Sequence, residues 1–98
     1  MPFMIETWDK PVHEHVRARE RDVHLRYLEI NKALLIACGA KLKDDGSNAG
    51  GGLYVVALET REEVEQFIAA DPFALAGLFE RVQITRWRQA YVDGICHL

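Results

Sequence analysis

A histidine and an aspartate are the two side chains in this sequence best suited to acid–base chemistry. His24 lies on a predicted helix, in a row with Arg21 and Leu28 that runs beside an apolar stripe. Its ring would therefore border a cleft and still reach solvent. A carboxylate hydrogen-bonded to one ring nitrogen fixes the imidazole tautomer and leaves the other nitrogen as a general base. Asp71 is the candidate for that carboxylate.

Each of these two residues also has a purely structural interpretation. A histidine at the rim of a buried helix face often does no more than cover the core. Asp71 stands directly before Pro72, where an aspartate caps a helix whose first residue is proline. Spacing along the chain cannot show whether His24 and Asp71 meet, so both interpretations stay open at this point.

Two other segments resemble ligand-binding motifs. Residues 43–52, K-D-D-G-S-N-A-G-G-G, lack the Lys-Ser/Thr and the following helix of a phosphate-binding P-loop, which favours a mobile connection that could close over a site as a lid. His13 and His15 are two residues apart near a helix start and do not share a face, and no third ligand is suitably spaced. We therefore predict no metal site.

Apolar periodicity predicts the elements that must position these residues. They are a strand Phe3–Trp8, a helix from Glu14 to a turn near Asn31–Ala33, strands Leu34–Leu42 and Leu53–Leu58, a helix from Thr60 to about Ala70, and a strand Phe79–Gln89. Residues 33–38 fit either a continued first helix or the second strand. The stripe expected to be buried on the first helix consists of Val16, Val23, Tyr27, Ile30 and Leu34. Cys38 is expected to be a small buried residue.

The predicted order, β-α-β-β-α-β, is that of the ferredoxin-like α+β sandwich, with two helices on one face of a four-stranded antiparallel sheet. The strand Leu53–Leu58 is apolar on both faces of its pleat, whereas a strand with one face in water should alternate. Two helices cover one face only. A second subunit is the simplest cover for the other, so we expect a homodimer.

Composition narrows the partners and the location. Ninety-eight residues predict one domain, 1–98, with a core over 3–89 and a loose tail over 90–98. The net charge of −3 argues against nucleic acid as a partner. No apolar run is long enough for a membrane span, and no secretory signal is visible. Two distant cysteines match no metal spacing, so a cytoplasmic, reducing location is expected.

Two motifs resemble those of the YciI-like (YCII-related) family. Residues 21–28, R-D-V-H-L-R-Y-L, are similar to its R-x-x-H-L-x-x-L helix segment, and residues 70–79, A-D-P-F-A-L-A-G-L-F, to its A-D-P-[FY]-x-x-A-G-L-[FY] segment. The resemblance implies a dimeric α+β barrel with a His–Asp pair in a cleft, which falls here on His24 and Asp71. It also implies a serine near the cleft, at Ser47. The family's common Gly-Pro is replaced by Gly39-Ala40, which alters a pocket wall.

The function implied by this resemblance is acid–base chemistry on a small molecule. One branch resembling the family removes halide from chlorinated hydroxyquinols, which suggests a hydroxylated aromatic or enol-like substrate. His24 and Asp71 would be catalytic in a lyase, dehalogenase or isomerase reaction that needs no cofactor, and Arg21 and Ser47 would hold the substrate. The alternatives are a non-catalytic binding module and an accessory subunit with the same dimeric fold.

Overall fold

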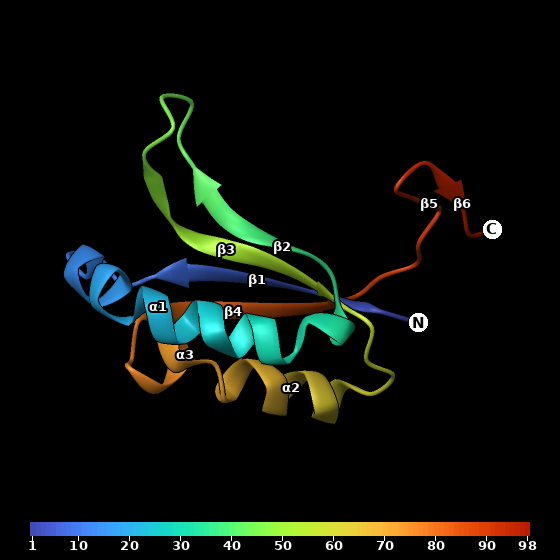
Figure 1. The fold of residues 1–98 in the computed structure, drawn as a ribbon, viewed down its shortest axis with the longest axis horizontal. Helices are drawn as coiled ribbons and strands as arrows, with labels where there is room; N and C mark the ends of the chain where they lie inside the picture. The colour runs from blue at the N-terminus through green and yellow to red at the C-terminus, as the bar shows by residue number, and fades with distance from the viewer.

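A four-stranded antiparallel sheet with helices packed on one face forms the body of the chain in the computed structural model, which describes residues 1–98 (Figure 1). The elements of the body are β1 (Phe3–Asp9), α1 (Glu14–Ile30), a 3-10 turn (Lys32–Leu34), β2 (Leu35–Leu42), β3 (Asn48–Val56), α2 (Arg61–Ala69), α3 (Pro72–Leu75) and β4 (Phe79–Arg86). The strand order is β2-β3-β1-β4. This arrangement confirms the predicted ferredoxin-like α+β fold.

The helix starts that were predicted from capping residues are confirmed, because those residues make the expected hydrogen bonds. The Thr60 side chain accepts a hydrogen bond from the Glu63 amide, and the Glu63 carboxylate bonds back to Thr60, which is a complete capping box at the start of α2. Asp71 caps α3, with Pro72 in its first turn. The first helix ends at Ile30 and the chain turns into β2, so the strand alternative is correct for residues 35–38, whereas residues 33 and 34 belong to the 3-10 turn.

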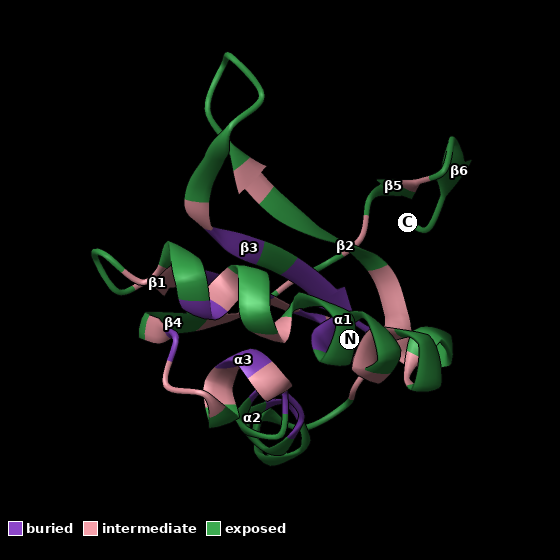
Figure 2. Cartoon of the chain, turned by 60° about the vertical axis from the view of Figure 1, so that its left-hand side comes forward, coloured by how far each residue is buried: buried purple, intermediate pink, exposed green.

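The predicted buried stripe of α1 is wrong in part. Val23 is 41% exposed and Ile30 is 82% exposed, whereas the buried residues of the helix are Val16 and His24. The helix is therefore rotated so that His24 points into the fold rather than lying at its rim. Figure 2 shows that only a small part of α1 is buried. Apolar residues surround much of α1, so periodicity alone left its inner face poorly defined.

The glycine-rich segment is not the long mobile loop that its composition predicts, because β3 already begins at Asn48. A Cβ at Gly51 would overlap the carbonyl oxygen of Thr7 on β1, and one at Gly52 would lie 3.0 Å from the carbonyl oxygen of Gly39 on β2. Glycine is required at position 51 and favoured at position 52 because neighbouring backbones approach closely within the sheet. Only residues 43–47 connect β2 to β3.

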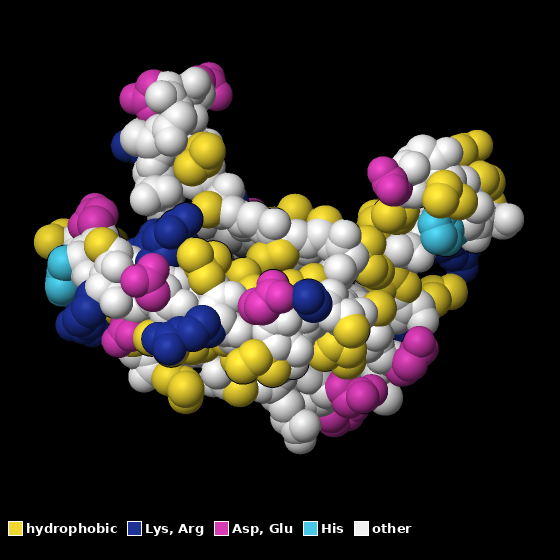
Figure 3. Space-filling view, in the orientation of Figure 1, with side chains coloured by type: hydrophobic (Ala, Val, Ile, Leu, Met, Phe, Trp, Pro, Cys, Tyr) yellow, Lys and Arg dark blue, Asp and Glu magenta, His cyan; other side chains and the backbone are white.

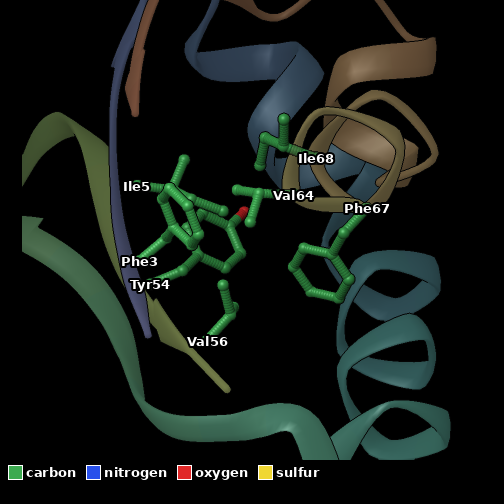
Figure 4. Close-up of a cluster of buried hydrophobic side chains, with 7 residues drawn as sticks. All are labelled: Phe3, Ile5, Tyr54, Val56, Val64, Phe67 and Ile68. Atoms are coloured by element: carbon green, nitrogen blue, oxygen red, sulfur yellow. The ribbon is translucent and has the colours of Figure 1, made fainter. Parts of the chain in front are cut away.

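Two clusters of buried apolar side chains hold the layers together. The larger joins the sheet to α2 and consists of Phe3, Ile5, Tyr54, Val56, Val64, Phe67 and Ile68 (Figure 4). The smaller, Val16, Phe73 and Leu78, joins α1 to α3 and to the start of β4. Because α1 and α3 share this second cluster, residues on these two helices are brought to one place in the fold.

The C-terminal residues form a small hairpin rather than a featureless tail. Strand β4 ends at Arg86, three residues before the predicted Gln89, and β5 (Tyr91–Val92) pairs with β6 (Ile95–Cys96). This hairpin projects away from the body, on the same side as the tip of the β2–β3 hairpin (Figure 1 and Figure 3). No helix combines the length and the apolar character needed to cross a membrane.

Candidate active site

The two residues singled out for acid–base chemistry are in direct contact. His24 Nδ1 lies 2.9 Å from Asp71 Oδ1, and the two come from the third turn of α1 and the N-cap of α3. Asp71 has no exposed surface, and His24 is 8% exposed. The contact depends on the packing of α1 against α3, which the sequence motifs themselves do not describe.

The Asp71 carboxylate is surrounded by three hydrogen-bond donors. Besides the contact with His24, Oδ1 accepts a hydrogen bond of 2.8 Å from the Phe73 amide, and Oδ2 accepts one of 2.9 Å from the Tyr54 hydroxyl. An ionised carboxylate is an acceptor only, so all three partners suit that form. Helix capping and contact with the histidine, which the sequence left as alternatives, are performed by the same oxygen atom.

Tyr54 is a part of this network that the sequence analysis missed. Burial and the neighbouring Asp71 carboxylate both raise the pKa of the Tyr54 hydroxyl far above its usual value, so it remains a protonated donor. The one available signal was a single polar tip within the apolar run Leu53–Leu58. Nothing in the spacing connects that tyrosine to Asp71, because the contact joins β3 to α3.

The His24 ring is held on its faces and edges as well as at Nδ1. It stacks on Phe73 with ring centroids 3.9 Å apart and planes 17° apart, and Tyr54 approaches edge-on at 6.3 Å. With Nδ1 facing a carboxylate, the expected neutral tautomer carries its proton on Nδ1. The second nitrogen, Nε2, is then left as a hydrogen-bond acceptor that can take a proton from a ligand.

His24 contributes to the wall of a cavity of about 190 Å³ between α1 and the sheet, which we call the His24 cleft. Six of its eleven lining residues are hydrophobic. The lining residues are Arg17, Arg21, His24, Leu25, Leu28, Cys38, Gly39, Ala40, Gly52, Tyr54 and Phe73. An apolar cavity with a few polar groups is the usual form of a small-molecule site.

The other predicted binding residues fall in different places. Arg21 lies in the cleft wall, as its position in the row with His24 suggested. Ser47 is not among the lining residues and lies in the β2–β3 turn, where its hydroxyl donates to Asp45 Oδ1 at 2.6 Å. Hydrogen bonds from Ser47 lower the pKa of Asp45. A substrate-binding role for Ser47 thus stays a prediction that the geometry of one chain does not support.

Cys38 is exposed on β2 at the cleft and is not the buried residue predicted from its apolar surroundings. Partial burial of the thiol and the nearby Asp71 carboxylate raise the pKa of Cys38 to about 11. The thiol therefore stays protonated near neutral pH and is a poor nucleophile. The chemistry that this cleft favours is proton transfer at His24 and not covalent attack by sulfur.

Arg17 also lines the cleft. Its Nε and Nη2 atoms donate to the two carboxylate oxygens of Asp9, at 2.6 and 3.0 Å. The guanidinium carbon lies 4.6 Å from the centre of the Phe73 ring, which in turn stacks on His24. No group of three or more His, Cys, Asp or Glu side chains is placed to hold a metal ion.

The chain is thus a small α+β protein with a ferredoxin-like sheet and a buried His–Asp pair whose histidine lines a small cleft. The chain belongs to the YCII-related domain family, whose match covers residues 1–88. This membership agrees with the two motifs that carry His24 and Asp71.

Two solved structures are similar to this chain to different degrees. The chain is 34% identical to 5-chloro-2-hydroxyhydroquinone dehydrochlorinase from Burkholderia phenoliruptrix, solved in complex with 2,5-dihydroxybenzoquinone, with a TM-score of 0.82 over 90% of this chain and 94% of that chain. A protein of Arabidopsis thaliana, At3g17210, is 13% identical with a TM-score of 0.47 over 94% of this chain and 97% of that one. None of the curated proteins matches the sequence.

Proposed function

We propose that this protein is an acid–base enzyme that acts on a small hydroxylated aromatic or enol-like molecule, with His24 as the proton carrier and Asp71 as its orienting partner. The observation that carries the proposal is the 2.9 Å contact between His24 Nδ1 and Asp71 Oδ1 in the wall of a largely apolar cleft. The similarity to an enzyme that acts on a chlorinated hydroxyhydroquinone supports the choice of substrate class.

The reaction assigned to the pair is proton removal from a hydroxyl group on a carbon–carbon double bond. Nε2 of His24 takes the hydroxyl proton, and the electron pair of the O–H bond forms a carbonyl. The double bond shifts, and a ring carbon accepts a proton, which is an isomerisation. Where that carbon carries a halogen, removal of a second hydroxyl proton forms a second carbonyl and a new ring double bond, and the halide departs with its bonding electrons, which is an elimination. One positioned histidine contributes about 10²–10⁴-fold to such steps.

The size and lining of the cleft support a single-ring substrate. An apolar protein cavity of about 150 Å³ accommodates benzene. The His24 cleft has about 190 Å³, which leaves room for a few ring substituents. Its apolar walls suit the ring faces, and Arg21 supplies a positive charge for an ionised hydroxyl group or a halide.

We also propose that the protein works as a homodimer, with or without further assembly, in the cytoplasm. The support is the sheet face opposite the helices, which by strand alternation carries Met4, Trp8, Leu53 and Val55. Such a face is suited to burial against a second copy. Sedimentation at micromolar concentration tests this proposal, and a single species of 11.2 kDa would contradict it.

Turnover of 5-chloro-2-hydroxyhydroquinone under anaerobic conditions tests the proposed activity. We expect chloride release by the native protein and a loss of about 10²–10⁴-fold in His24→Gln. Asp22→Asn, an exposed change on the same helix, serves as the control and should retain the native rate. Tight binding of 2,5-dihydroxybenzoquinone without turnover of any hydroxylated ring would instead favour the non-catalytic binding module.

A further inference from the structure

A second cavity of about 200 Å³ lies beside the His24 cleft and has a different character. Only one of its nine lining residues is hydrophobic. The walls come from the end of β1, the first turn of α1 and the β2–β3 hairpin, and consist of Asp9, Lys10, Pro11, Glu14, Arg17, Lys43, Asn48, Ala49 and Gly50. We call this cavity the lysine pocket, after Lys10 and Lys43.

Arg17 is the one residue that lines both cavities. Its side chain is 14% exposed and is held in place by the two contacts with Asp9 and by the Phe73 ring. The same Phe73 ring stacks on His24 at 3.9 Å. A short series of side-chain contacts therefore connects the His24 ring with the boundary of the lysine pocket, and the two cavities adjoin at Arg17.

The charges of the lysine pocket are unevenly matched. Both carboxylate oxygens of Asp9 are engaged by Arg17, so this acid is already neutralised. Lys10 and Lys43 form no salt bridge within the chain, and Glu14 is the one other acid in the lining. Two free ammonium groups thus face one free carboxylate, and the side-chain amide of Asn48 adds a neutral donor. This balance favours an anionic ligand group.

We propose that the substrate carries a carboxylate on a short aliphatic tail, and that this carboxylate binds in the lysine pocket while the hydroxylated ring occupies the His24 cleft. The inference rests on the proposed function and narrows its substrate class to ring or enol acids. Arg17 forms the wall between the two groups, and Lys10 and Lys43 hold the carboxylate. Binding energy from such a remote group helps to orient the reacting ring.

The test uses matched ligands and calorimetry on the full chain. The probes are 4-(2,5-dihydroxyphenyl)butanoate and its uncharged primary amide, with 2,5-dihydroxybenzoquinone as a ligand for the His24 cleft alone. We expect the acid to bind about tenfold more tightly than the amide, as two partly exposed charge contacts would give. The double variant Lys10→Gln, Lys43→Gln should bind the acid no better than the amide, with its affinity for the amide unchanged.

Lys32→Gln is the matched control, because Lys32 lies at the far end of α1, outside both cavities. It should keep the tenfold preference. Equal affinities for acid and amide in the native protein, together with binding of the quinone, would overturn the inference and leave the proposed function standing. Failure of the native protein to bind any of the three probes would overturn both.

Discussion

Asp71 Oδ1 lies 2.9 Å from His24 Nδ1, a contact between residues that are 47 positions apart in the sequence and that joins α1 to the N-cap of α3. The same oxygen accepts a hydrogen bond from the Phe73 amide in the first turn of α3. The position of the carboxylate is thus fixed by backbone geometry and not only by a side-chain rotamer. A ring oriented in this way needs little rearrangement to accept a proton, which is how preorganised sites lower barriers.

Asp71→Asn separates capping from the acid–base role. Asparagine is an equally good N-cap, so α3 should be retained. It removes the negative charge that stabilises the imidazolium formed during proton transfer, and we expect the turnover number to fall about 10²–10⁴-fold. Circular dichroism and initial rates of chloride release check the two parts. A variant that is folded and retains the native rate would show that Asp71 only caps the helix.

Tyr54→Phe leaves Asp71 Oδ2 buried without a donor and should lower the free energy of unfolding by about 1.5–3 kcal/mol at pH 7. Because the pKa of Tyr54 is raised in the folded protein, its hydroxyl loses its proton at a lower pH in the unfolded chain than in the folded one. The stabilisation that comes from the protonated hydroxyl is therefore complete below about pH 10, the ordinary pKa of tyrosine, and is progressively lost above it. The difference between native and variant should therefore narrow above pH 10.

Urea unfolding at pH 7 and at pH 10.5 measures both effects of Tyr54→Phe. Tyr91→Phe, on the exposed β5 strand, is the control and should change stability by less than about 0.5 kcal/mol. A difference between Tyr54→Phe and native protein that stays the same at both pH values would contradict the assigned hydrogen bond.

Cys38 should resist alkylation near neutral pH although it is exposed. Because the pKa of its thiol is raised to about 11, the thiolate is scarce at pH 8 and the rate should climb steeply between pH 9 and pH 11. Asp71→Asn removes one cause of the raised pKa and should speed the reaction. Mass spectrometry after iodoacetamide treatment reports each site separately, with exposed Cys96 as the internal reference. Faster modification of Cys38 than of Cys96 at pH 8 would contradict the account.

Gly51→Ala tests whether the glycines of β3 are structural. A Cβ there would overlap the Thr7 carbonyl oxygen, and the φ of +151° disfavours any side chain, so we expect a loss of more than about 2 kcal/mol. Gly39→Ala, on the adjacent strand, meets no atom within 4 Å and should be neutral within about 0.5 kcal/mol. Thermal unfolding of both variants measures the two changes in stability. If residue 51 lay in a flexible loop, Gly51→Ala would be tolerated as well as Gly39→Ala.

The order of elements and the helix starts could be predicted from the sequence because the signals are local. Thr60 with Glu63, and Asp71 with Pro72, each specify a helix start within four residues. Family resemblance added the pairing of His24 with Asp71, which local signals cannot supply.

What could not be predicted depends on contacts between distant segments. The inner face of α1 is decided by α3 and the sheet, so Val23 was expected inside and His24 at the rim. The glycines at 50–52 suggested flexibility, whereas Gly51 and Gly52 lie where the backbones of β1 and β2 approach closely. The hydrogen bond from Tyr54 to Asp71 likewise exists only because the fold brings β3 near the N-cap of α3.

The most direct test of the central claim is the protonation of the two His24 ring nitrogens, measured by ¹⁵N NMR of the native protein with and without 2,5-dihydroxybenzoquinone. The account predicts a proton on Nδ1, held by Asp71, and a change in the Nε2 signal when the quinone binds. A ring protonated on Nε2 alone, or an Nε2 signal that does not respond to the bound quinone, would contradict it.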